Sequence, residues 1–140
     1  MKNFEGNLFD SFGTLKYFLH EGKYKLILEV DQQLADFYFN LIPDYVDVNR
    51  QKYPAHVSVV RNEIPVNLDE WGKYEGKEIE FIYSNYVNEG TVYFWLNVFS
   101  KDLEKIRLEL GLPVNSIYTL PPEGFVKCFH MTIGNKKKVP

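Results

Sequence analysis

The segments HVSV at 56–59 and HMTI at 130–133 repeat one pattern: a histidine, an apolar residue, a hydroxyl residue and a second apolar residue. Side chains alternate between the two faces of a β-strand. Each segment would therefore bury its apolar residues on one face and present an imidazole and a hydroxyl on the other, about 7 Å apart. The pattern predicts two short strands that carry His56 with Ser58 and His130 with Thr132.

The segment before the first motif predicts a hairpin, a helix and a strand. Strands at 13–20 and 23–30 flank a Glu-Gly turn, as in a β-hairpin. Asp31 can cap a helix that runs to about Leu41, and the first motif strand follows at 55–60. Four helix residues at helical spacing are expected to share the buried face: Leu34, Phe37, Tyr38 and Leu41.

The second half of the chain repeats this order. After a long loop at 62–76, strands at 77–84 and 91–99 are predicted on either side of Asn-Glu-Gly. Ser100 can cap a helix that ends before a glycine and a proline, and the last strand is predicted at 126–133. Two similar halves of strands and a helix predict a single α+β domain over 1–140. The second helix is expected to bury Leu103, Ile106 and Leu110.

Composition is that of a globular domain. The chain has 140 residues, of which 45% are hydrophobic, 16% aromatic and 25% charged, which is enough apolar surface for a core. No apolar run reaches the about 18 residues of a membrane helix, and the first ten residues lack the apolar segment of a secretory signal. We therefore expect a cytoplasmic protein without a membrane partner.

The cysteine count and the net charge exclude several classes of site. Cys128 is the only cysteine, so this chain alone cannot form a disulfide, a zinc finger or an iron–sulfur site. The net charge of −3 argues against a broad basic surface for duplex nucleic acid. A small anionic ligand in a local pocket remains open. Cys128 itself is interpreted as a small apolar filler.

The two motifs suit proton-transfer chemistry at a phosphodiester. Imidazoles have a pKa near 6.5, so one ring can remove a proton while the other delivers one. The hydroxyls of Ser58 and Thr132 can donate to the non-bridging oxygens and stabilise the transition state. This chemistry needs no metal or other cofactor, and it suits a neighbouring ribose 2′-OH or a water molecule as nucleophile.

The motifs resemble those of the 2H phosphoesterase superfamily, whose members carry one His-x-Thr/Ser motif in each lobe of a bilobal fold. The ending CFHMTIGN at 128–135 looks like the phage-associated "Swiss Army Knife" branch, which includes an anti-CBASS nuclease that degrades cyclic oligonucleotide immune signals. The resemblance implies two pseudo-symmetric sheet lobes with flanking helices and a central cleft. The lobes would comprise approximately residues 13–61 plus 126–135, and 77–125.

The resemblance also implies roles for the motif residues. His56 and His130 would be the acid–base pair, and Ser58 and Thr132 would donate to phosphate oxygens. A threonine is commoner in the family where this chain has Ser58, and serine lacks the methyl group that restricts the rotamer. Two other interpretations stay open: half-buried histidines with satisfied hydrogen bonds, and a metal held by two histidines. His20, with a glycine two residues on, is interpreted as a surface turn residue.

Substrate-binding residues are predicted from their chemistry and, for Trp71 and Tyr74, from their place in a long loop. Aromatic rings stack on bases, and Tyr17, Trp71 and Tyr74 are the candidates, although most aromatic residues must be in the core. Arg61 and Lys136 follow the two motif strands and could offset phosphate charge, although each could also be a solvated surface charge.

Three classes of function follow. The first is a metal-independent phosphodiesterase, by resemblance one that opens 3′–5′ bonds of cyclic oligonucleotide signals by 2′-OH attack. A variant of it hydrolyses terminal 2′,3′-cyclic phosphates in RNA or tRNA processing. The second is a non-catalytic module that sequesters nucleotides, and the third is an interaction protein, in which the two imidazoles would face separate surfaces.

Overall fold

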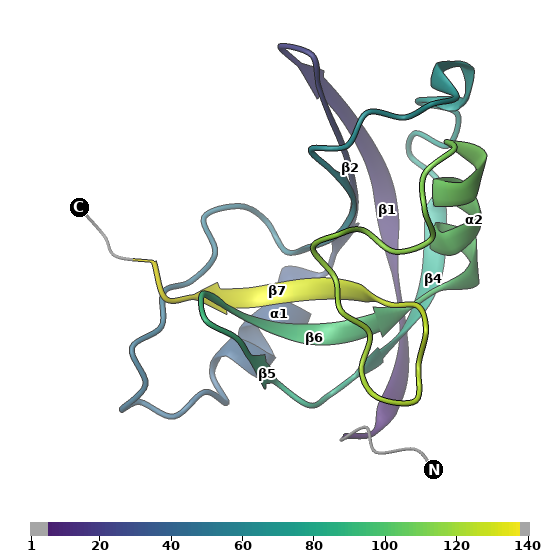
Figure 1. Ribbon diagram of the computed structural model, residues 1–140. Coiled ribbons are helices and arrows are strands. Elements are labelled where there is room, and N and C mark those ends of the chain that lie inside the picture. Colours follow the sequence, from purple (N-terminus) through teal and green to yellow (C-terminus); the bar gives the residue numbers. More distant parts are fainter. Residues whose placement is uncertain (1–5, 138–140) are drawn as a thin grey trace.

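In residues 6–137, which the computed structural model describes, the strands belong to one sheet, in which β6 and β7 lie side by side across the middle of the molecule (Figure 1). The strands are hydrogen-bonded in the order β4-β1-β2-β3-β7-β6-β5, every pairing is antiparallel, and a pairing of β4 with β6 closes this order into a ring. The strands are β1 (Leu8–His20), β2 (Lys23–Val30), β3 (His56–Arg61), β4 (Glu78–Ser84), β5 (Asn88–Glu89), β6 (Tyr93–Phe99) and β7 (Phe129–Asn135). The helices are α1 (Gln32–Phe39), α2 (Lys101–Glu109) and the short 3₁₀ helix η1 (Leu68–Glu70).

The chain runs through the ring twice in the same order, so the predicted α+β class is confirmed. The first pass is β1, β2, α1 and β3, and the second is β4, β6, α2 and β7. The two passes meet where equivalent strands pair, β1 with β4 and β3 with β7. The predicted boundaries placed the last strand with the first lobe. In the structure, β7 pairs with β6 from Val98–Phe129 to Tyr93–Asn135 and with β3 at Val57–Met131.

The first hairpin is confirmed, and its first strand is longer than predicted. Glu21 and Gly22 both have positive φ, 52° and 74°, as the two central residues of a type I′ turn require. The strand begins at Leu8 rather than at Gly13 because β4 pairs with it from Thr14 back to Leu8. The backbone hydrogen bonds of this pairing extend the strand, and the sequence around Leu8 alone does not predict them.

The pairing predicted for the second half is wrong in part. The strands at 78–84 and 93–99 exist, but β4 pairs mainly with β1 and meets β6 only at Ile82–Phe99 and Tyr83–Val98. The short strand β5 forms the hairpin with β6 instead. The last strand begins at Phe129, three residues later than predicted, and continues to Asn135.

Both helix caps are confirmed, and one helix face is not. The Asp31 side chain accepts from the Gln33 N–H at 2.9 Å, and the Ser100 hydroxyl accepts from the Leu103 N–H at 3.3 Å. All three residues predicted on the inner face of α2 are buried. The first helix ends at Phe39 rather than near Leu41; Tyr38 is buried and Leu34 half-buried, whereas Phe37 on the helix and Leu41 beyond it are 59% and 57% exposed. The eight residues of α1 cover the sheet with one narrow face.

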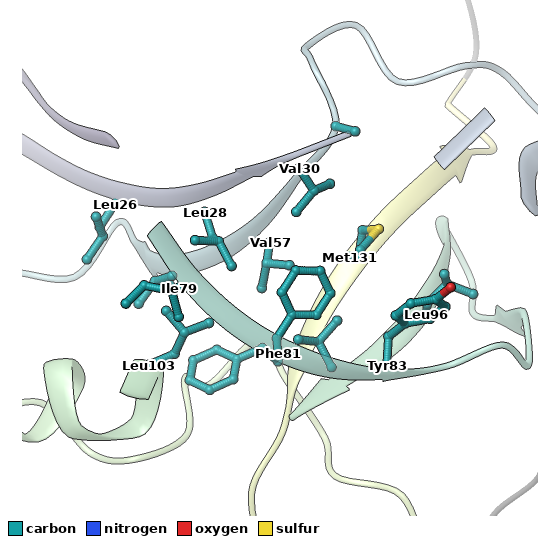
Figure 2. Packing of buried hydrophobic residues seen from close by; sticks show 14 of the residues in the cluster. Leu26, Leu28, Val30, Val57, Ile79, Phe81, Tyr83, Leu96, Leu103 and Met131 are labelled. Atoms are coloured by element: carbon teal, nitrogen blue, oxygen red, sulfur yellow. The ribbon is translucent and has the colours of Figure 1, made fainter. Parts of the chain in front are cut away.

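The residue between the histidine and the hydroxyl residue of each motif, Val57 or Met131, is part of the hydrophobic core (Figure 2). Val57 and Met131 are fully buried and belong to the same cluster as Leu28, Leu96 and Phe81. Since strand side chains alternate, the histidines and hydroxyls of both motifs project from the opposite face of the sheet. No helix within residues 6–137 is long and apolar enough to cross a membrane.

Candidate active site

The register between β3 and β7 places the two motifs side by side on neighbouring strands. The residues paired across the two strands are Val57 and Met131, the middle residue of each motif. In an antiparallel ladder this register sets His56 opposite Thr132 and Ser58 opposite His130. The four predicted residues therefore lie on one face of two neighbouring strands.

This arrangement fixes the spacing of the site. Residues directly opposite each other have Cβ atoms about 4.5–5.5 Å apart, and diagonal neighbours lie about 7–8 Å apart. Each imidazole thus faces a hydroxyl across the strands, and the two histidines occupy one diagonal. A phosphate group is small enough to contact all four side chains at this spacing.

A pocket of about 570 Å³ opens beside these strands, a volume within the usual range for small-molecule sites. Ser58, His130 and Thr132 line it, together with side chains of β6 and of the segment that follows α2. His56 is not among the lining residues. The structure therefore brings three of the four motif residues to the pocket wall and places the fourth beside it, on the strand face that they share.

His130 is held flat against an indole. Its ring stacks on Trp95 with centroids 4.8 Å apart and planes 23° apart, and the Trp95 indole N–H donates to the Asn97 side-chain oxygen at 3.2 Å. The Nε2 atom of His130 is buried without a hydrogen-bond partner among residues 6–137. Burial lowers the pKa of His130 to about 4, and a backbone hydrogen bond at Leu120 acts in the opposite direction. The free site thus holds a neutral imidazole with an unused nitrogen.

His56 has a defined tautomer. Its Nδ1 lies 2.8 Å from the carbonyl oxygen of Pro54, which can only accept, so Nδ1 carries the proton and Nε2 of the neutral ring keeps its lone pair. Burial lowers the pKa of His56, as do the nearby charges of Lys25 and Arg61, while the hydrogen bond to Pro54 and the charge of Glu29 raise it. Both motif histidines therefore favour the neutral state in the free protein.

The depressed pKa of His130 predicts a pH dependence of stability. The pKa of His130 is about 4 in the folded protein and about 6.5 in the unfolded chain. The neutral ring therefore makes its full contribution to the free energy of unfolding above pH 6.5. This contribution is lost as the pH falls toward 4. Between pH 6.5 and 5, the protein should lose about 1–2 kcal/mol more free energy of unfolding than the variant His130→Ala. Urea unfolding of both proteins at the two pH values measures this difference, and equal losses would contradict the shift.

Of the predicted substrate-binding residues, only Arg61 lines the pocket. Trp71 packs edge-on against Tyr17, with centroids 4.9 Å apart, and the Tyr74 hydroxyl donates to Glu109 at 2.6 Å. Tyr17 lies on β1, and the loop that carries Trp71 and Tyr74 folds back on the first hairpin, so these three aromatic residues pack against the core. Lys136 forms an ion pair with Glu89.

Sequence reasoning missed three aromatic residues of the pocket. Tyr93 and Trp95 lie on the outward face of β6, and Tyr118 lies on the segment after α2. The first two carried a signal, because Tyr93 and Trp95 alternate with the buried Phe94 and Leu96. Tyr118 carried none, since its segment has no regular structure.

The remaining candidates of the sequence are accounted for by their surroundings. Cys128 is buried, and burial raises the pKa of its thiol to about 12, so it is not a reactive nucleophile. His20 is exposed at the end of β1, and its Nε2 atom lies 3.3 Å from Oε1 of Glu21, a residue of the hairpin turn. Within residues 6–137, no group of three or more histidine, cysteine, aspartate or glutamate side chains could hold a metal ion.

Comparison with known proteins gives no relative. No family model matches the chain, and no curated protein and no solved structure shows a significant similarity to it.

Proposed function

We propose that the chain is a phosphodiesterase that cleaves 3′–5′ phosphodiester bonds by two-histidine acid–base catalysis. The observation that carries this proposal is the register of β3 and β7, which pairs the middle residues of the two motifs. This register puts two imidazoles and two hydroxyls on one strand face, with Ser58, His130 and Thr132 lining the pocket and His56 beside it. The two similar passes of the chain support the same interpretation, a bilobal fold of the 2H phosphoesterase kind with its cleft at the strand pair.

In the proposed reaction, a ribose 2′-OH attacks the adjacent phosphorus. One imidazole takes the hydroxyl proton through its free Nε2, and the other, protonated, delivers a proton to the departing 5′ oxygen. The bond between phosphorus and the 5′ oxygen breaks, which leaves a 2′,3′-cyclic phosphate and a free 5′-OH. The hydroxyls of Ser58 and Thr132 donate to the non-bridging oxygens as negative charge builds on them.

The acid must gain its proton in the complex. Both motif histidines have a lowered pKa in the free protein, mainly because burial disfavours the charged ring. A bound phosphodiester places a negative charge beside the imidazoles, and a nearby opposite charge raises a histidine pKa. The substrate thus supplies the charge that makes one ring an effective acid. An anionic substrate suits this site better than a neutral one for this reason.

The favoured substrates are cyclic oligonucleotide immune signals, a choice that rests on the resemblance of the motifs. The same residues could instead hydrolyse a terminal 2′,3′-cyclic phosphate with water as the nucleophile. The two reactions differ in their products, because only the first creates new chain breaks.

Product analysis tests the proposal directly. The full chain is incubated with a cyclic dinucleotide, a linear ribodinucleotide and a nucleoside 2′,3′-cyclic phosphate, with and without EDTA, and the products are identified by mass spectrometry. We expect new 2′,3′-cyclic phosphate ends from the first two substrates at a rate that the chelator leaves unchanged. Opening of the 2′,3′-cyclic phosphate alone would favour the end-processing reaction, and loss of activity in EDTA would favour a metal mechanism. Binding without turnover would favour a sequestering module.

A further inference from the structure

Arg61 is the one arginine of the chain whose guanidinium group forms no salt bridge with a carboxylate within residues 6–137; its backbone N–H donates to Glu63 at 3.2 Å. The chain has three arginines. Arg50 pairs with Asp36 at 2.9 Å and Arg107 pairs with Glu63 at 2.8 Å, whereas Arg61 forms no salt bridge with any described residue. An exposed guanidinium that borders a pocket and lacks a counter-ion is free to bind an anion in bidentate geometry.

A second cation lies next to it. The guanidinium carbon of Arg61 and the ammonium nitrogen of Lys137 lie 6.0 Å and 5.2 Å from the ring centroid of Tyr93. Lys137 and Arg61, both close to the Tyr93 side chain, lower the pKa of its hydroxyl, while burial acts in the opposite direction. Lys137 likewise has no salt-bridge partner in the described part of the chain. A neutral phenol does not compensate two positive charges, so the cluster of Arg61, Tyr93 and Lys137 keeps its attraction for anions.

The cluster lies at a short distance from the motif residues. Tyr93 is two positions from Trp95 on the outward face of β6, a separation of about 7 Å along a strand, and Trp95 pairs with Thr132. Arg61 ends β3, three positions after Ser58. Both Tyr93 and Arg61 line the pocket that contains His130. The distance between the two anion-binding groups is thus on the scale of one nucleotide.

We propose that Arg61 and Lys137, arranged around Tyr93, bind a second phosphate of the substrate, next to the phosphodiester that the motif residues cleave. This inference rests on the proposed function for the identity of the first phosphate. It assigns the substrate class: molecules with two or more phosphates bind better than molecules with one. A cyclic or linear oligonucleotide meets this condition, whereas a nucleoside 2′,3′-cyclic phosphate does not.

Deoxydinucleotides test the second site without interference from cleavage, because they lack the 2′-OH nucleophile. Binding of dApdA to the full chain is measured by calorimetry at low salt and compared with binding of the same molecule phosphorylated at its 5′ or its 3′ end. We expect one phosphorylated form to bind about 10-fold more tightly than dApdA. Arg61→Gln should remove that gain, and Lys137→Gln should reduce it. Both residues are exposed, so neither substitution disturbs the core.

The matched control is Arg50→Gln, which removes the same charge from another exposed arginine and should leave the gain unchanged. The inference is overturned if neither phosphorylated form binds more tightly than dApdA, if none of the three binds, or if the gain survives in Arg61→Gln. Cleavage of the corresponding ribodinucleotides is scored separately. A gain that depends on Arg61, without any cleavage, would reject the proposed function and keep the phosphate site.

Discussion

Replacement of His130 by alanine is expected to lower kcat by about 10²- to 10⁴-fold, the usual contribution of a positioned acid or base. The ring lines the pocket, lies flat on Trp95 and has an Nε2 atom without a partner among the described residues. No other histidine within residues 6–137 lines that pocket. Because no described residue forms a hydrogen bond with Nε2, the variant should keep the native circular dichroism spectrum and unfold cooperatively.

The matched control for this prediction is His20→Ala. His20 is exposed at the end of β1, next to the hairpin turn, so its loss should leave kcat unchanged on the same substrates. His56→Ala should lose activity to a similar degree, and the double variant should lose much less than the product of the two effects, since the two imidazoles serve one reaction. A His130→Ala protein with wild-type kcat would remove this residue from the chemistry. If the loss of kcat in the double variant equals the product of the two single losses, the two histidines act independently and do not serve one reaction step.

The elements of the fold that depend on local chemistry were predictable. The turn at Glu21 and Gly22 and the caps at Asp31 and Ser100 arise from a few neighbouring residues, and all of them are present in the structure. Pairings between distant segments were not predictable in this way. The extension of β1 to Leu8 depends on β4, which lies about 70 residues further along the chain. The residues around Leu8 do not indicate which distant strand will pair with them.

The same division applies to the site. Alternation along each motif strand determines which side chains share a face, and so the four motif residues were identified without coordinates. Trp71 and Tyr74 were chosen by their loop position instead, and Trp71 packs between Tyr17 and Tyr24, with centroids 4.9 Å and 5.0 Å from its own. A large aromatic ring in a loop lowers its free energy by covering apolar surface, and this tendency is independent of any ligand. Trp95, on a strand next to a motif, was the better candidate.

The buried Arg107 connects the site to the second helix. Its side chain is fully buried, donates to the carbonyl oxygen of Val59 at 2.8 Å and forms two hydrogen bonds to Glu63, at 2.9 Å and 2.8 Å. Its Nε donates to the carbonyl oxygen of Pro113 at 2.7 Å. Val59 follows Ser58 on β3, and Pro113 leads into the segment that contributes Tyr118 to the pocket. One side chain therefore joins α2 to a motif strand and to the start of the pocket wall.

Removal of this side chain should destabilise the protein more than any surface substitution. Arg107→Ala leaves the Glu63 carboxylate, which is only 16% exposed, without its counter-ion, and it leaves two carbonyl groups without their donor. Breaking a buried ion pair in this way lowers the free energy of unfolding by about 3–5 kcal/mol, a large part of the total for a domain. Urea unfolding measures the loss, with Lys105→Ala as control, since Lys105 lies on the same helix with a side chain that is 70% exposed.

A double substitution separates the charge from the packing. In Arg107→Met with Glu63→Met, both charges are absent and apolar atoms fill most of the space, so no carboxylate remains unpaired. Replacing a buried ion pair by apolar residues of similar volume is often neutral or stabilising, and we expect the double variant to regain most of the stability lost in Arg107→Ala. Equal instability of the two proteins would assign the effect to the backbone hydrogen bonds at Val59 and Pro113 instead. In that case the second helix would hold the motif strand through its carbonyl groups, and the ion pair would serve only to orient the guanidinium.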